Sequence, residues 1–124
     1  MAAWLDATVI KRIDWNSHLF SLRFECQDFP GFIAGQFIKV GLLSSDGQIL
    51  SRPYSLVNSP DKDFLEIMAV PVTDGSLSPK LHLLNTGDTV KLMSPATGFL
   101  TLNEVPQSNR LFMLATGTGV GPFL

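Results

Sequence analysis

Alternation of apolar and polar residues is the clearest pattern in the chain. Within residues 18–27 the even positions from Phe20 to Cys26 are apolar and the odd positions from Ser21 to Gln27 are polar. This period of two is typical of a strand with one face in a core, and it places Cys26 on the buried face as a small hydrophobe. β-branched or alternating runs predict further strands at 7–13, 34–40, 64–72, 87–93 and around Arg52.

One stretch has the pattern of a helix. A loop containing Gly75 is followed by serines that can cap a helix and by Pro79, which suits the first helical turn. Leucines at 77, 81 and 84 share one face, and residues 85–87 supply a stop, so the helix has about two turns. Six short strands with one helix favour an antiparallel β-barrel, because closure removes exposed edges.

Composition narrows the class of protein. The 124 residues are 45% hydrophobic and 16% charged, which predicts one globular domain with a single core. A formal net charge of −2 offers no basic surface for nucleic acid or for an anionic membrane. No apolar run approaches the ~20 residues of a membrane span, so we expect a soluble, cytoplasmic protein.

Candidate metal ligands are scarce. Cys26 is the only cysteine, which excludes an internal disulfide and a Cys₄ iron–sulfur cluster built from these residues. His18 has no second histidine, cysteine or carboxylate at ligand spacing. We therefore expect no metal site.

The strand that contains Arg52 carries the candidate chemistry. Side chains two apart in a strand point the same way, so Arg52 and Tyr54 share a face with Cα atoms about 6.6 Å apart. A guanidinium fork beside an aromatic ring suits a ligand with a phosphate and a flat ring, such as a flavin nucleotide. Pro53 cannot donate to a ladder and predicts an edge or irregular strand. The alternative is an ordinary strand with an exposed Arg and a half-buried Tyr.

The predicted helix start offers a second phosphate anchor. Backbone N–H groups at a helix N-terminus favour an anion, and Gly75, Ser76 and Ser78 lie there. FAD presents two phosphates, which would match an Arg fork and a helix start. The alternative is that the serines only cap the helix.

The end of the chain breaks the alternating pattern. Residues 111–115 are continuously apolar, which is typical of a strand buried on both faces of a parallel sheet. They lead into the Gly-rich run 116–122, which predicts a turn that opens a helix and brings backbone near a pyrophosphate.

Three motifs together resemble the ferredoxin/flavodoxin–NADP reductase family, in its bacterial FAD-containing form. They are Arg52-Pro53-Tyr54-Ser55, Gly75-Ser76-Leu77-Ser78 and Gly117-Thr118-Gly119-Val120-Gly121-Pro122-Phe123, in the family's order and rough spacing. The resemblance implies a six-stranded antiparallel Greek-key barrel that binds FAD at residues 1–105. It also implies that residues 110–124 are the truncated start of an NADP-binding domain.

The resemblance also implies the chemistry. Hydride would pass between NADPH and bound FAD, and electrons between FAD and ferredoxin or flavodoxin. The resemblance assigns Arg52 to the FAD pyrophosphate and Tyr54 to one face of the isoalloxazine. Ser55 would hydrogen-bond near flavin N5, which requires a local bend for which Pro53 is a plausible cause, so Tyr54 and Ser55 are the candidate catalytic residues. The remaining implied contacts come from the loop around Gly75, from the phosphate-binding segment Ser76-Leu77-Ser78, and from Thr116 where the two domains meet.

We expect a monomer, and little NADPH-dependent activity from the 124-residue chain alone. Two alternative functions remain consistent with the sequence. One is a related NAD(P)H-dependent flavin reductase or oxygenase reductase component with the same barrel. The other is a small β-barrel binding module without enzymatic activity.

Overall fold

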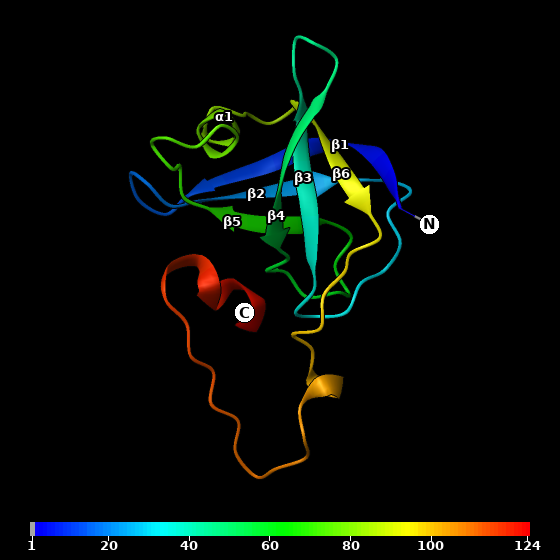
Figure 1. The fold of residues 1–124 in the computed structure, drawn as a ribbon, viewed down its shortest axis with the longest axis vertical. Helices are drawn as coiled ribbons and strands as arrows, with labels where there is room; N and C mark the ends of the chain where they lie inside the picture. Colours follow the sequence, from blue (N-terminus) through cyan, green and yellow to red (C-terminus); the bar gives the residue numbers. More distant parts are fainter. Residues whose placement is uncertain (1) are drawn as a thin grey trace.

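Six strands form one antiparallel sheet in the computed structural model, which describes residues 2–124 (Figure 1). The strands are β1 (Ala3–Asp14), β2 (Phe20–Glu25), β3 (Phe37–Leu43), β4 (Ile49–Ser55), β5 (Leu65–Ala69) and β6 (Thr89–Ser94). A short helix, α1 (Ser78–His82), connects β5 to β6, and two 3₁₀ helices follow, η1 (Leu102–Glu104) and η2 (Gly117–Phe123). No helix within residues 2–124 is long and apolar enough to cross a membrane.

The sheet curls until its two edges meet. The strand order is β4-β3-β6-β1-β2-β5, so β6 lies between β3 and β1, and β4 and β5 are the edges. These edges contact each other, and just beyond β4 the N–H of Val57 donates to the carbonyl oxygen of Glu66 on β5 at 2.9 Å. The mainly-β, antiparallel barrel predicted from the sequence is confirmed.

The core fills the inside of this curled sheet. Phe20, Leu22 and Phe24 are fully buried, as their alternation predicts. Cys26 lies just past the end of β2, half-buried against the core, and its thiol donates to the carbonyl oxygen of Asp6 at 3.5 Å. Burial raises the pKa of the Cys26 thiol, which keeps it protonated near neutral pH.

Strand β4 is an edge strand, as Pro53 predicts, and it is regular. A tight hairpin turn at 44–48 joins it to β3, with Gly47 in the left-handed region at φ +84°. The pairing with β3 then runs without a shift from Leu43 opposite Ile49 to Phe37 opposite Ser55. The local bend that a Ser55 contact near flavin N5 would require is therefore absent from the pairing of β4.

Helix α1 is shorter than predicted and begins without a serine cap. It spans five residues, its N-cap is Leu77, and no side chain caps it. Ser78 Oγ instead accepts a hydrogen bond from the N–H of Val72 at 2.8 Å. Leu77 and Leu81 are buried at 1% and 0% exposure, so burial of apolar side chains places this helix rather than capping.

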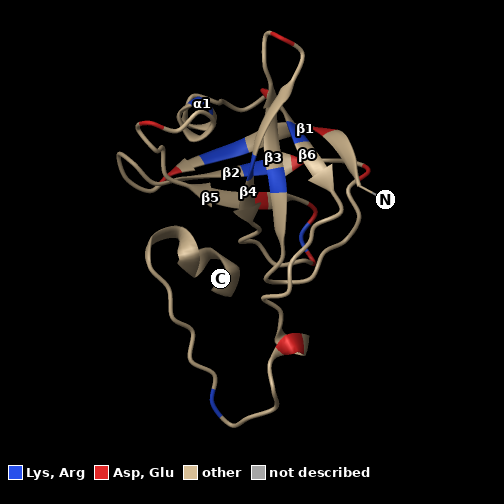
Figure 2. Cartoon of the chain, viewed as in Figure 1, with Lys and Arg blue, Asp and Glu red and all other residues tan. Residues whose placement is uncertain are grey.

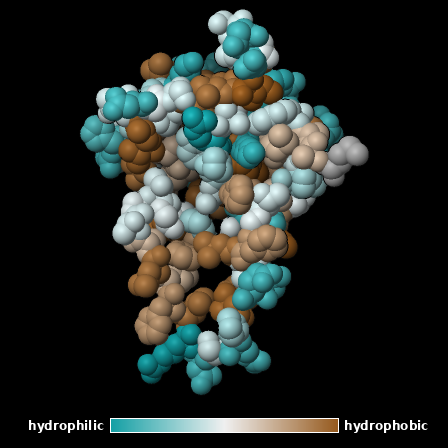
Figure 3. All heavy atoms as spheres, viewed as in Figure 1, coloured by the Kyte–Doolittle hydropathy of each residue, from teal (hydrophilic) through white to brown (hydrophobic). Residues whose placement is uncertain are grey.

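The segment after β6 leaves the barrel and returns to it. In Figure 1 it runs as a long loop through η1 and comes back so that η2 contacts β5. Figure 2 shows few charges along it, and residues 95–124 contain only Glu104 and Arg110 as charged side chains. Apolar residues gather there in Figure 3, among them Phe99, Phe112 and Leu114 at 82%, 79% and 86% exposure.

The structure differs from the sequence-based expectation at residues 111–115. This run is not a strand, and its large apolar side chains are exposed. A strand needs a neighbouring strand to pair its N–H and C=O groups, and no described residue pairs with this run. The Gly-rich run that follows does form a helix, of the 3₁₀ type.

Candidate functional site

A groove of about 480 Å³ lies where the two edge strands approach each other. One wall is β4, another is β5 with the residues that follow it, and η2 contributes one residue. The turn at 72–78 covers one side. The lining consists of Arg52, Tyr54, Met68, Ala69, Val70, Val72, Asp74, Gly75, Ser76, Leu77, Ser78 and Thr118.

Arg52 provides the only positive charge in this lining. Its side chain is exposed, its Nη1 donates to the carbonyl oxygen of Ser51 at 2.7 Å, and its Nη2 lies 3.4 Å from Ser76 Oγ. None of the ion pairs among the described residues includes Arg52. The guanidinium therefore keeps free N–H groups for an anion, and the lining also holds one carboxylate, that of Asp74.

Tyr54 lies on the same face of β4 as Arg52. They pair with Ile38 and Val40 of β3, which are both buried, so this face points toward the inside of the barrel. The Tyr54 ring packs half-buried against the core. Burial raises the pKa of the Tyr54 hydroxyl and the charge of Arg52 works in the opposite direction, so the hydroxyl is neutral at physiological pH.

The turn at 72–78 is held by its own hydrogen bonds. The N–H of Gly75 donates to the carbonyl oxygen of Val72 at 2.7 Å, and Ser78 Oγ accepts from the N–H of Val72. A Cβ atom at position 75 would lie 3.0 Å from the Val72 carbonyl oxygen and 3.2 Å from Ser78 Oγ. Glycine is therefore favoured by close packing. The Ser78 hydroxyl is buried and occupied, whereas Ser76 is exposed beside Arg52.

The fold brings most of the predicted site residues together. Arg52, Tyr54 and the whole Gly75–Ser78 motif line the groove. Pro53, Ser55 and Thr116 do not line it. Ser55 pairs with Phe37, one step along from Tyr54, so its side chain points to the opposite face of β4.

Sequence reasoning missed several lining residues. Met68 lies on β5 and Val70 directly follows that strand, and Thr118 rather than Thr116 reaches the groove from η2. One signal was available for the first two. The run 64–72 is apolar on both faces except at Glu66, and an outward apolar face indicates that something covers it. Thr118 lies in the Gly-rich motif, which marks this segment but not this residue, and nothing in the sequence marks Asp74.

The groove joins three kinds of surface. Arg52 and Ser76 offer hydrogen-bond donors and positive charge, Tyr54 offers an aromatic ring, and Met68 and Val70 offer an apolar wall. Such a lining fits an anionic ligand with a flat ring system. A group of three or more metal-binding side chains is not found within residues 2–124.

Comparisons with known proteins agree with this chemistry. Residues 5–100 match the family model described as the oxidoreductase FAD-binding domain. The chain is 49% identical over 124 residues to the flavodoxin/ferredoxin–NADP reductase of Escherichia coli strain K12, covering 100% of this chain and 49% of that protein. It is 42% identical over 124 residues to the reductase of the same name from Buchnera aphidicola subsp. Baizongia pistaciae, again covering 100% and 49%.

A solved structure agrees as well. The crystal structure of a ferredoxin NADP⁺ reductase from Neisseria gonorrhoeae with bound FAD and NADP superposes with a TM-score of 0.91 at 32% identity. That match covers 97% of this chain and 48% of the other. The chain thus spans about half the length of the relatives it matches.

Proposed function

Because the chain belongs to the oxidoreductase FAD-binding domain family, we propose that the groove between β4 and β5 binds FAD, as the flavin domain of a ferredoxin/flavodoxin–NADP reductase. The observation that carries the proposal is the placement of an unpaired Arg52 beside Ser76, on the same strand face as Tyr54. The names of the relatives and the bound FAD of the Neisseria gonorrhoeae reductase support the choice of cofactor and reaction.

Each wall of the groove has a task in this proposal. Arg52 and Ser76 hold the pyrophosphate, since a guanidinium and a hydroxyl both donate to phosphate oxygens. The turn around Gly75 brings its backbone close to the same phosphates. Leu77 and Ser78 form the floor, with Ser78 fixing the turn. Pro53 keeps the outer edge of β4 from pairing with another strand.

Tyr54 is the proposed contact of the flavin ring. A half-buried ring can stack on one face of the isoalloxazine, which contributes about 0.5–1.5 kcal/mol beyond the area it buries. Met68 and Val70 then exclude water from the other side of the groove. Ser55 and Thr116 remain predictions as flavin contacts, because a ligand confined to the groove lining touches neither.

The chemistry of the reaction belongs to the cofactor. Bound FAD supplies a centre that accepts a hydride and releases electrons one at a time. The protein residues bind it, orient it and limit the access of water. Tyr54, neutral at physiological pH, does this without adding a negative charge beside the ring.

We propose further that residues 110–124 begin an NADP-binding domain and that the whole protein takes NADPH as its reductant. The exposed apolar run at 111–115 supports this, since a strand of a second sheet would bury it. Ferredoxin or flavodoxin, named for the relatives, is the proposed partner protein. A cytoplasmic location and a monomeric state remain predictions.

The test is the visible absorbance of the purified chain, followed by titration with FAD and with FMN. A flavin spectrum, or tighter binding of FAD than of FMN, is expected because two phosphates offer more to Arg52 and the turn than one. Flavin that copurifies argues for a bound cofactor, whereas weak and exchangeable flavin argues for a flavin reductase. A colourless chain that binds neither flavin contradicts the proposal.

A further inference from the structure

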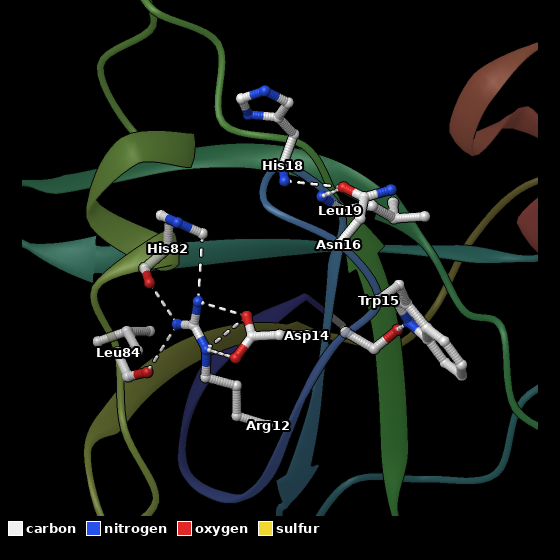
Figure 4. Close-up of polar contacts among 9 residues, drawn as sticks. Arg12, Asp14, Trp15, Asn16, His18, Leu19, His82 and Leu84 are labelled. Atoms are coloured by element: carbon white, nitrogen blue, oxygen red, sulfur yellow. Dashed lines mark hydrogen bonds and ion pairs between the residues drawn. The ribbon is translucent and has the colours of Figure 1, made fainter.

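Arg12 reaches from the sheet to the far end of α1. It lies on β1, and its Nη1 donates to the carbonyl oxygens of His82 and Leu84, the latter at 3.0 Å (Figure 4). Its Nη2 lies 3.2 Å from Nδ1 of His82. Arginine can only donate, so the His82 nitrogen is the acceptor in this contact.

The remaining donors of Arg12 point to Asp14. Nε and Nη2 donate to this carboxylate at 3.1 and 2.9 Å. The guanidinium also lies over the ring of Phe20, 5.0 Å from its centroid, and the side chain is 17% exposed. An arginine has five N–H groups, and these contacts occupy all of them. Arg12 thus has a structural role, because all of its N–H groups are engaged and none is free to bind a ligand.

These contacts matter because α1 cannot hold its own position. A helix of five residues is far too short to be stable alone, and no side chain caps its N-terminus. The carbonyl groups at its C-terminal end lack intrahelical partners, and Arg12 satisfies two of the carbonyls there. The helix begins at Ser78, which lines the groove with Leu77. Arg12 therefore holds the helix from the end opposite the groove.

We propose that Arg12 is a positioning residue for the flavin groove, which it shapes by fixing α1 and hence the turn at 72–78. The proposal rests on the proposed function, because it concerns the affinity of the groove for FAD. It predicts that losing Arg12 weakens phosphate binding by the turn while leaving the Tyr54 wall on β4 unchanged.

The chain contains a matched control for this experiment. Arg23 on β2 also pairs with a carboxylate, that of Glu66, and also lies over a phenylalanine ring, 4.4 Å from the centroid of Phe64. Its side chain is 30% exposed. None of its hydrogen bonds reaches α1 or the turn at 72–78. Arg23→Gln thus removes an ion pair and a contact over an aromatic ring like those of Arg12, without contacts to the carbonyl groups at the end of α1.

The experiment compares Arg12→Gln with Arg23→Gln in the full 124-residue chain. Dissociation constants for FAD and for riboflavin, which lacks phosphate, are measured by flavin fluorescence alongside the melting midpoint. Arg12→Gln should weaken FAD binding about threefold to thirtyfold and leave riboflavin binding unchanged. The loss of FAD affinity should be larger in Arg12→Gln than in Arg23→Gln, even where the two variants lose the same melting temperature. If Arg12→Gln does not fold, Asp14→Asn removes only the orienting carboxylate and should shift FAD binding in the same direction.

The outcomes separate the two proposals. Equal losses of FAD affinity in the two arginine variants, or parallel losses for FAD and riboflavin, overturn the role of Arg12 and leave the proposed function intact. Failure of the unmodified chain to bind any flavin overturns the proposed function itself.

Discussion

Arg52→Ala is the sharpest test of the groove as a phosphate site. The change removes an exposed side chain whose contacts within the described chain are the carbonyl oxygen of Ser51 and the hydroxyl of Ser76. Little stability should be lost, because an exposed side chain with these two contacts contributes little to folding. Any large effect must then appear in ligand binding.

The magnitude follows from the free donors of the guanidinium. Two of its five N–H groups are engaged, which leaves enough for a bidentate contact with a phosphate. A charge-assisted hydrogen bond contributes about 1.5–3 kcal/mol. At 1.4 kcal/mol per decade, Arg52→Ala should weaken FAD binding about tenfold to a hundredfold. Arg52→Lys keeps the charge but loses the guanidinium fork, so its affinity for FAD should lie between those of the unmodified chain and of Arg52→Ala.

The assay is titration of the purified variants with FAD and with riboflavin, followed by flavin fluorescence. Arg110→Ala is the matched control, because Arg110 is exposed on the loop between η1 and η2 and does not line the groove. Riboflavin affinity should not change in any variant, since riboflavin carries no phosphate. An Arg52→Ala chain that binds FAD as tightly as the Arg110→Ala chain would refute the phosphate assignment.

Three further predictions concern single residues. Tyr54 is the only tyrosine, so alkaline difference absorbance should give one transition above pH 10, and Arg52→Ala should move this transition to higher pH. Because the raised pKa of Tyr54 favours the neutral form in the folded state, stability should fall as pH rises from about 10 through that pKa. A Cβ atom at Gly121 would lie 2.6 Å from Cγ1 of Val57, so Gly121→Ala should displace η2 at a cost of about 1–3 kcal/mol, measurable as faster proteolysis after β6. The hydrogen bond from the neighbouring guanidinium lowers the pKa of Asp14, so its contribution is present above about pH 4 and is lost as the pH falls through that lowered pKa. The difference in melting midpoint between the unmodified chain and Asp14→Asn should therefore shrink in acid, and a constant difference would contradict the assignment.

Local patterns were enough to predict the strands and the face that carries the chemistry. The period of two in β2 identifies Phe20, Leu22 and Phe24 as core residues, because a strand in a curled sheet has one face turned away from solvent. The same period places Arg52 and Tyr54 on one face of β4, and the missing N–H of Pro53 predicts an edge strand.

The features that the sequence did not predict depend on contacts between distant parts of the chain. Arg12 meets His82 across 70 positions, and nothing local marks that contact. The prediction that a serine caps α1 was wrong, because the Ser78 hydroxyl accepts a hydrogen bond from the N–H of Val72 and burial of apolar side chains sets the helix boundary. The strand predicted at 111–115 has the right composition, but a ladder partner is a property of the surrounding structure and not of the run itself.

The position of β6 has a consequence for the order of assembly. β1, β2 and β5 form one ladder and β3 and β4 form another, and β6 is the strand that joins them. It is also the last of these six strands to be synthesised. Until residues 89–94 emerge, a nascent chain lacks the strand that joins the two ladders, and only the contact between the edges β4 and β5 can hold them together. Pairing of β6 with β1 then closes the longest loop in the sheet, so this late, non-local step should set the folding rate of the barrel.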